Sequence, residues 1–193
     1  MIEVVFDTNL VIDVEEKRES YKDILDLLEL EKQNKLKIHI PVIIASEKTI
    51  NTNKITNFKQ FKEYMKNLGF KNTELLKPIC YFGISFWNYC ILAGDEIVKL
   101  AKEIHEVLFD NIEFDHSEYC KKRGGIEYSK GIQKKWKNAI IDTLILWSAI
   151  YYDKKILVTR DGDFHKHKKE IKELWGINIK NSHEILEEIK NES

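Results

Sequence analysis

"VVFDTNLVID" occupies residues 4–13, and it begins with an apolar run that stops at Asp7. Residues 2–6 have the continuous apolar character of a strand buried on both faces of a parallel sheet. Thr8 and Asn9 follow directly, and Asp, Thr and Asn are all common turn and cap residues. However, an acid at the carboxyl end of a parallel strand also lies where open α/β sheets bind ligands. Asp7 is therefore either a structural stop or part of a site, and acids elsewhere in the chain have to distinguish the two.

Composition limits the class of protein. The chain has 193 residues, 43% of them hydrophobic and 33% charged, which suits one soluble globular domain over residues 1–193. The net charge of −1 gives no general reason to expect binding to nucleic acid or membrane. No apolar stretch approaches the roughly 20 residues that span a bilayer. The start, MIEVVFD, lacks the basic and apolar regions of a signal peptide, so we expect a cytoplasmic protein.

Three cysteines bear on the compartment in which the protein is expected. Cys80, Cys90 and Cys120 are odd in number and have no CxxC spacing. We therefore expect reduced, buried thiols, as in a cytosolic protein.

The two ends of the chain show alternating strand and helix patterns. Strands are expected at residues 2–6, 35–41, 154–159 and 176–180, and helices at 20–34, 42–50, 138–152 and after Ser182. Ser20 with Asp23 resembles a capping box, and Pro41 is well placed to open the helix over 42–50. This βαβ rhythm predicts an α/β fold with a mostly parallel central sheet.

The middle of the chain is less regular. Helices are expected over residues 58–68, ending at Gly69, and over 96–108. The aromatic stretch 79–92 fits a buried helix or a strand equally well. Residues 115–137 are polar and contain glycine, so we expect a loop there.

Four positions carry acids toward one edge of the predicted sheet. Asp142 lies within the apolar helix 138–152, where an unpaired carboxylate costs several kcal/mol and needs a cation or strong donors. Asp7 and Asp161 follow apolar strands, and Glu47 lies near the start of the helix after the second strand. Asp163 follows Asp161 closely. Oxygen-only ligands of this kind suit Mg²⁺ or Mn²⁺.

Each acid also has a structural interpretation. Asp142 could pair with a basic residue from elsewhere in the fold. The "DGD" of residues 161–163 is commonly a turn, and Glu47 could be a solvated helix residue. Four acids at one rim are harder to explain in this way, because without cations they repel one another.

These motifs resemble those of the PIN-domain ribonucleases. "FDTN" at the start, Glu47 after "IPVIIAS", Asp142 in "NAIIDTLILWSAI" and "LVTRDGDF" agree with the family in order and in strand or helix setting. The closing "SHEIL" is similar too. The resemblance covers roughly residues 1–50 and 136–190, and it implies a three-layer α/β/α fold. Residues 58–130 then form a helical and loop elaboration in the middle of the chain.

The resemblance implies a role for each motif residue. Asp7 is the central metal ligand, Asp142 a second direct ligand, and Asp161 completes the site directly or through water. Glu47 binds metal-bound water or a second ion, and Asp163 assists. Thr8 and Asn9 hold the Asp7 carboxylate by hydrogen bonds. The expected cofactor is Mg²⁺ or Mn²⁺, and the expected catalytic acids are Asp7, Glu47, Asp142 and Asp161.

An RNA substrate requires positive charge near these acids. The candidate substrate-binding residues are Arg123, Lys130, Lys134, Lys137 and Arg160. The structural alternative is that such residues are simply solvated, because a third of the chain is charged. Trp136, which lies among the lysines, is more typical of a packing residue than of a base-stacking platform.

Three functions remain open from the sequence. The leading one is a metal-dependent endoribonuclease, of the toxin or defence type, with an antitoxin-like protein inhibitor as a partner and with homo-oligomerisation open. The second is a catalytically inert PIN-fold module that binds RNA or protein, which the presence of all four acids disfavours. The third is a Mg²⁺-dependent phosphatase of the haloacid dehalogenase type, which also begins with a strand ending in Asp. That chemistry requires an acid two residues later, where this chain has Asn9.

Overall fold

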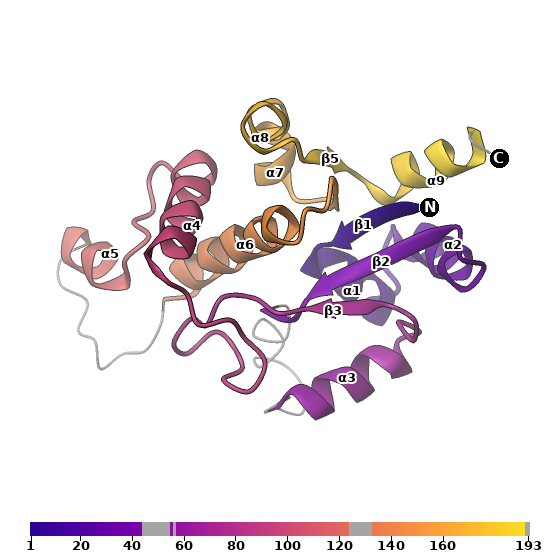
Figure 1. Cartoon of the computed structure of the whole chain (residues 1–193), viewed down its shortest axis with the longest axis horizontal. Coiled ribbons are helices and arrows are strands. Elements are labelled where there is room, and N and C mark those ends of the chain that lie inside the picture. Colours follow the sequence, from indigo (N-terminus) through magenta and orange to yellow (C-terminus); the bar gives the residue numbers. More distant parts are fainter. Residues whose placement is uncertain (44–54, 56, 124–132, 192–193) are drawn as a thin grey trace.

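A parallel sheet forms the centre of the molecule (Figure 1). The computed structural model describes residues 1–43, 55, 57–123 and 133–191. Within them, five strands pair in the order β3-β2-β1-β4-β5, and every pair is parallel. The strands are β1 (Ile2–Phe6), β2 (Leu36–Pro41), β3 (Glu74–Leu76), β4 (Ile156–Val158) and β5 (Asn178–Lys180). The strands expected at both ends of the chain are confirmed.

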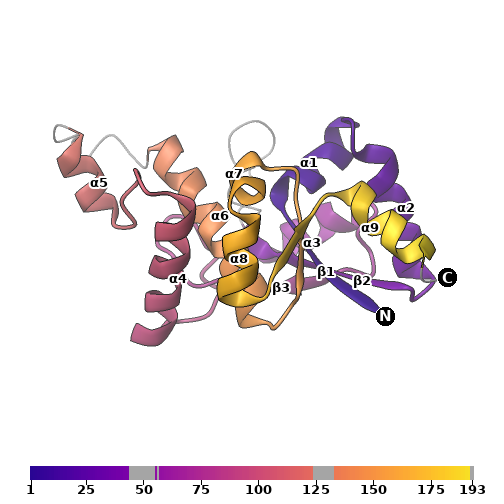
Figure 2. The same cartoon turned by 90° about the horizontal axis from the view of Figure 1, so that it is seen from above.

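Helices cover both faces of the sheet (Figures 1 and 2). They are α1 (Thr8–Glu16), α2 (Tyr21–Lys32), α3 (Phe58–Asn67), α4 (Asp95–Leu108), α5 (His116–Lys122), α6 (Lys134–Tyr151), α7 (Gly162–Lys166), α8 (Lys168–Trp175) and α9 (Ser182–Asn191). Val4 and Phe6 of β1 share one core with α1, α2, α3 and α9, whereas Val5 shares the other with α4, α6 and α8. Because successive strand side chains point to opposite faces, β1 contributes to both cores. The expected three-layer α/β/α architecture is confirmed.

Helix α6 is the most buried helix of this architecture. Eleven of its 18 residues are buried, including Leu144, Ile145 and Trp147. One side of α6 faces the sheet and another packs against α4, so almost every direction around the helix is apolar. This explains the nearly continuous apolar sequence from which the helix was expected.

Residues 58–123 contribute both to the sheet and to its two cores. β3 pairs with β2 at the edge of the sheet, and α4 packs on α6. Helix α3 ends at Asn67, and Gly69 follows its end as expected, with a φ of 102° that suits glycine and would strain other residues.

Several helices were missed because the aspartate that caps them was assigned to a turn or loop. Asp7 caps α1, which the sequence analysis did not expect. Asp115 caps α5 by accepting from the backbone N–H groups of Ser117 and Glu118, so the loop expected over residues 115–137 is wrong in that part. Asp161 caps α7 in the same way, where a turn was expected. An aspartate favours both turns and helix starts, so composition alone does not separate them.

Two expected helix starts differ in detail. Ser20 precedes α2, but its side chain makes no capping hydrogen bond. At α9 the capping residue is Asn181 rather than Ser182. The Asn181 side chain accepts from the Glu184 N–H at 2.9 Å, and the Glu184 carboxylate accepts from the Asn181 N–H at 2.6 Å. This reciprocal pair is a capping box displaced by one residue.

The helix expected over residues 42–50 lies mostly outside the described residues. Pro41, expected to open it, is the last residue of β2. Residues 42 and 43 form a helical turn, and residues 44–50 are not among those that the structure describes.

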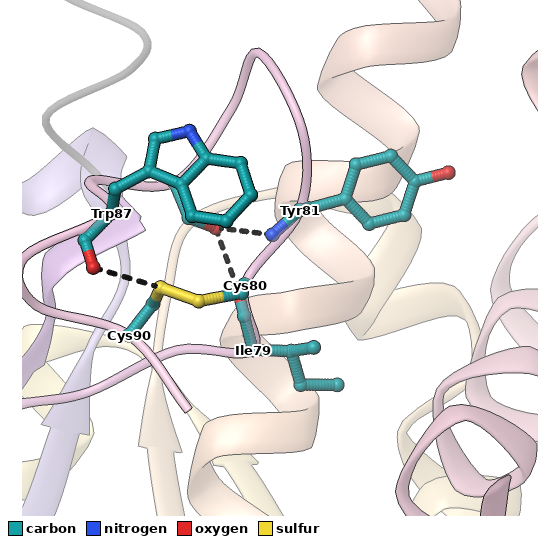
Figure 3. The surroundings of a disulfide bond; sticks show 6 residues. Ile79, Cys80, Tyr81, Trp87 and Cys90 are labelled. Carbon is teal, nitrogen blue, oxygen red and sulfur yellow. Dashed lines mark hydrogen bonds between the residues drawn. A yellow bond between two sulfur atoms is a disulfide. The ribbon is translucent and has the colours of Figure 1, made fainter. Parts of the chain in front are cut away.

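The aromatic stretch 79–92 is neither helix nor strand, and a disulfide closes it (Figure 3). Cys80 and Cys90 are bonded, with their Cα atoms 5.0 Å apart. Ile79 and Ile91 form an isolated parallel bridge, and the Cys80 N–H donates to the Ile91 carbonyl at 2.8 Å. The expectation of three reduced thiols is therefore wrong for this pair, because the backbone bridge that brings the cysteines together is not visible in their spacing. Cys120 is a free, buried cysteine.

Reduction of this disulfide should lower the thermal stability. A cross-link that closes a short loop restricts the unfolded chain, and the loop-closure relation gives about 3 kcal/mol for a sequence separation of 10 residues. We expect a reductant to lower the melting temperature of the wild type and to leave the Cys80→Ser/Cys90→Ser double variant unchanged. Alkylation of the unreduced, denatured wild type should label Cys120 alone. Labelling of all three cysteines would contradict the disulfide.

No helix among the described residues is long and apolar enough to cross a membrane.

Candidate functional site at the β1–β4 edge

The sheet changes its direction of winding between β1 and β4. From β1 the chain moves outward to β2 and β3, and it then returns to the opposite side of β1 to form β4 and β5. Side by side, β1 and β4 align Phe6 with Val158, and the Asp7 N–H donates to the Val158 carbonyl at 3.0 Å. The carboxyl ends of two such strands border the crevice in which open α/β sheets bind ligands. Asp7 and Thr159 are the first residues after these strands.

The Asp7 carboxylate is buried and firmly held. Its side chain is only 3% exposed and accepts a short hydrogen bond from the Thr8 backbone N–H. The Asn9 Nδ2 donates to Oδ2 at 2.7 Å, and the Thr159 hydroxyl donates to the same oxygen at 2.6 Å. Three donors stabilise the ionised carboxylate and fix its orientation. The Thr8 backbone N–H and the Asn9 side chain thus both donate to the Asp7 carboxylate.

Thr159 was not identified from the sequence, although it joins most groups of this edge. It is fully buried, and its hydroxyl oxygen also accepts from Asn9 Nδ2 at 3.0 Å and from the Asp161 N–H at 2.9 Å. The only signal in the sequence is its place as a small hydroxyl residue at the end of the strand, directly before "RDGDF".

Asp161 lies at the same edge and is half-buried. Its carboxylate accepts from the Asp163 N–H at 2.8 Å, and this bond caps α7. Asp163 is exposed. The structural and functional interpretations of "DGD" therefore coexist, because the cap occupies only part of the capacity of the Asp161 carboxylate to accept hydrogen bonds or bind cations.

Asp142 and Glu47 complete the expected set of acids. Asp142 is half-buried on α6 between the buried residues Ile141 and Thr143, and it interacts with its surroundings. Because Asp142 is only half-buried, burial of its carboxylate costs less free energy than was inferred from the sequence. Glu47 lies outside the described residues. Within residues 1–43, 55, 57–123 and 133–191, no three acid, histidine or cysteine side chains gather closely enough to hold a metal ion.

The chemistry of the expected donors nevertheless fits a hard divalent cation. Asp7 and Asp161 are linked through Thr159, and both offer carboxylate oxygens. Oxygen ligands without sulfur or imidazole are those that Mg²⁺ and Mn²⁺ prefer.

Arg160 pairs with an acid that the sequence analysis did not single out. Asp13, on α1, is completely buried, and its Oδ2 lies 2.9 Å from the Arg160 Nε. The Arg160 backbone N–H donates to the Asn9 Oδ1 at 3.4 Å. Asp13 is the last residue of the stretch 4–13, but its burial follows from helix α1, which was not expected from the sequence.

The other candidate substrate-binding residues lie in several environments. Arg123 contacts Glu113 through Nη1 at 2.6 Å, and its guanidinium lies 3.9 Å from the centre of the Tyr119 ring. Lys134 is exposed, Lys137 is half-buried, and Lys130 lies outside the described residues.

Trp136 packs in the core of the molecule. It is buried and donates from Nε1 to the Glu113 carbonyl at 3.0 Å, as the packing interpretation predicted.

No protein-family model matches the chain. A search of curated proteins finds no match either. Among solved structures, the chain is similar to a chain in the crystal structure of VapBC2 from Rickettsia felis bound to a DNA fragment from their promoter. The two are 16% identical, the alignment covers 93% of this chain and 98% of that chain, and the TM-score is 0.43. A likeness this distant carries no functional argument, which has to come from the residues of the site.

Replacement of Arg123 should destabilise the protein. Arg123 and Lys122 both pair with Glu113. The hydrogen bond from Lys122 is the largest cause that lowers the pKa of Glu113 to about 2, and its own backbone and Arg123 contribute. We expect Arg123→Ala to lower the free energy of unfolding by about 1–2 kcal/mol, because an ion pair and a cation–π contact are lost. As the pH falls from 4.5 toward about 2, Glu113 becomes protonated and this difference should shrink.

Urea unfolding at several pH values measures the difference. Lys121→Ala, at an exposed position of the adjoining helix α5, is the control and should change stability by less than about 0.5 kcal/mol. Equal effects of the two variants would show that the Arg123 contacts do not stabilise the fold.

Proposed function

We propose that this chain is a PIN-like, divalent-metal-dependent endoribonuclease whose reaction centre is the β1–β4 edge. The observation that carries the proposal is the Asp7 carboxylate, which is 3% exposed and held by donors from Thr8, Asn9 and Thr159 at the switch point of the sheet. A charged group is rarely buried so close to an edge of this kind without a function. The sequence resemblance to PIN-domain ribonucleases supports the same assignment.

Each acid has a stated role in this proposal. Asp7 and Asp142 are direct metal ligands, Asp161 binds directly or through water, and Asp163 assists. Glu47 binds metal-bound water or a second ion. A bound Mg²⁺ or Mn²⁺ supplies charge neutralisation and a water of lowered pKa for hydrolysis of the RNA phosphodiester.

The hydrogen-bond network around Asp7 fixes the orientation of its carboxylate. The Asn9 amide and the Thr159 hydroxyl both donate to Asp7 Oδ2, so this oxygen has a fixed direction before any ligand arrives. Groups that are held in place in advance need no reorganisation when charge develops in the reaction.

The position of Asn9 argues against a phosphatase of the haloacid dehalogenase type. That chemistry uses an acid two residues after the nucleophile to protonate the leaving group, whereas the Asn9 amide donates to Asp7 and has no proton of suitable acidity to transfer. Absence of activity toward p-nitrophenyl phosphate is the expected result.

The partners are proposals that rest on the sequence resemblance alone. They are an RNA substrate, an antitoxin-like protein inhibitor and a second copy of the chain. A cytoplasmic location is a separate proposal, which was expected in part from the cysteine pattern. The Cys80–Cys90 disulfide would then have to persist in a reducing compartment, which structural disulfides seldom do.

Cleavage should depend on the metal and on the acids of the site. We expect purified protein to cut a pool of structured and unstructured RNAs with Mn²⁺ or Mg²⁺, and to lose this activity in excess chelator. Asp7→Asn and Asp142→Asn should each lower the rate at least about 100-fold, because each removes a ligand and a charge. Asp26→Asn, at an exposed position of α2, is the matched control and should cut normally. Full activity after exhaustive metal removal would exclude the metal-dependent mechanism.

Metal binding should also be visible without any substrate. We expect Mn²⁺ to raise the melting temperature of the wild type, by an amount corresponding to about 2.7 kcal/mol at a concentration 100 times the dissociation constant. The increase should be smaller for Asp142→Asn and unchanged for Asp26→Asn. Calorimetric melts with and without Mn²⁺ measure it. If Asp142→Asn melts far below the wild type without metal and shows the same increase with it, Asp142 is a structural residue.

A further inference from the structure

We propose that Asp13 is a positioning residue that orients Arg160 to bind a phosphate of the substrate at the β1–β4 edge. This inference rests on the proposed function, because it assigns the group that holds the nucleic-acid backbone beside Asp7. Neither the sequence resemblance nor the comparisons assign a role to Asp13.

The environment of Asp13 requires a positive partner. Its side chain is completely buried on the face of α1 that also carries the buried residues Leu10 and Val14. Among the described residues, neither of its carboxylate oxygens has a hydrogen-bond partner. The Arg160 Nε lies 2.9 Å from Oδ2, so the contact is an ion pair whose N–H is not aligned on the oxygen. A buried carboxylate without this cation would be strongly destabilised.

Arg160 is joined to the reaction centre through its backbone. It lies between Thr159, which donates to Asp7, and Asp161, which caps α7. Its N–H donates to the carbonyl oxygen of the same Asn9 side chain whose amide holds Asp7. The position of Arg160 beside the acids is therefore fixed by the same network that orients Asp7.

The ion pair leaves most of the guanidinium available. The Arg160 side chain is 43% exposed, and the nitrogen that lies 2.9 Å from Asp13 is Nε. Within the described part of the chain, no other carboxylate lies within ion-pair distance of Arg160. A guanidinium has five N–H donors, and the two terminal nitrogens can bind two oxygens of one phosphate. Asp13 thereby holds the Arg160 guanidinium against α1, so that the guanidinium does not neutralise Asp7 or Asp161.

The structural alternative is that the pair only stabilises the fold. The two roles predict opposite signs for RNA affinity. Asp13→Asn removes a negative charge close to the proposed phosphate site, so electrostatics alone predicts tighter binding of RNA by the folded variant. If Asp13 positions Arg160, the variant binds more weakly despite its more positive charge.

The test measures binding of a fluorescein-labelled single-stranded RNA by fluorescence anisotropy. Ca²⁺ replaces Mn²⁺ to neutralise the acids, a gel checks that the probe stays intact, and circular dichroism checks that each variant is folded at the assay temperature. We expect Asp13→Asn and Arg160→Gln each to raise the dissociation constant about tenfold, because a phosphate contact is lost. Arg160→Gln should also flatten the dependence of log Kd on log salt by about one unit.

Matched variants separate positioning from general effects. Arg18 lies just after helix α1, and its side chain is 47% exposed, which is similar to Arg160. Arg18→Gln should leave Kd unchanged. In the Arg160→Gln background, Asp13→Asn should have no further effect on Kd, because the group that it positions is absent. Arg160→Lys keeps the charge but not the planar fork, and it should rescue binding only in part.

Each outcome decides the inference. Binding by Asp13→Asn that equals or exceeds that of the wild type overturns it, as does an effect of Arg160→Gln no larger than that of Arg18→Gln. If Asp13→Asn does not fold, Asp13→Leu, which places an apolar side chain at the buried position, takes its place in the same comparison with the same two outcomes. A wild type that binds RNA but does not cut it with Mn²⁺ refutes the proposed function and leaves the binding comparison valid. A wild type that binds no single-stranded RNA refutes the inference.

Discussion

The hydrogen bond from the Thr159 hydroxyl to Asp7 Oδ2 joins residues that are 152 positions apart in the chain. It forms because β1 and β4 are parallel neighbours whose carboxyl ends meet at one edge of the sheet. Asn9 and Asp161 both bond to Thr159, and Arg160 bonds to Asn9, so the orientation of these groups around Asp7 depends on that pairing. The two cores on either face of the sheet hold β1 and β4 in register and thereby stabilise the site from outside it.

Much of the fold could be predicted from the sequence because its strands and its main helix are buried. Residues 2–6 and the helix α6 are apolar in almost every direction, and this pattern can be recognised in the sequence alone. The helices α1 and α5 were missed for a local reason, since the capping aspartate resembles a turn residue. The disulfide was missed for a non-local reason, because an isolated bridge between Ile79 and Ile91 brings Cys80 and Cys90 together.

The candidate site likewise contains residues that the sequence indicates and residues that only the structure reveals. Asp7, with Thr8 and Asn9, could be singled out because an acid at the end of a buried strand is unusual within a short stretch of sequence. Thr159 and Asp13 could not, since their importance lies in partners distant in the chain, Asp7 for the first and Arg160 for the second. Conversely, Arg123 was assigned to substrate from its charge alone, whereas its contacts with Glu113 and Tyr119 give it a structural environment.

The central position of β1 also has a consequence for the order of synthesis. The ribosome makes Asp7 long before Thr159, and at about 5–20 residues per second the interval is roughly 8–30 s. During this time β1 can pair with β2, but the β4 side of the sheet, with Thr159 and Asp161, does not yet exist. The edge around Asp7 is therefore incomplete on every nascent chain that does not yet reach Thr159. For the proposed nuclease, the order of the strands in the sequence would delay activity until the β4 side of the sheet has been made.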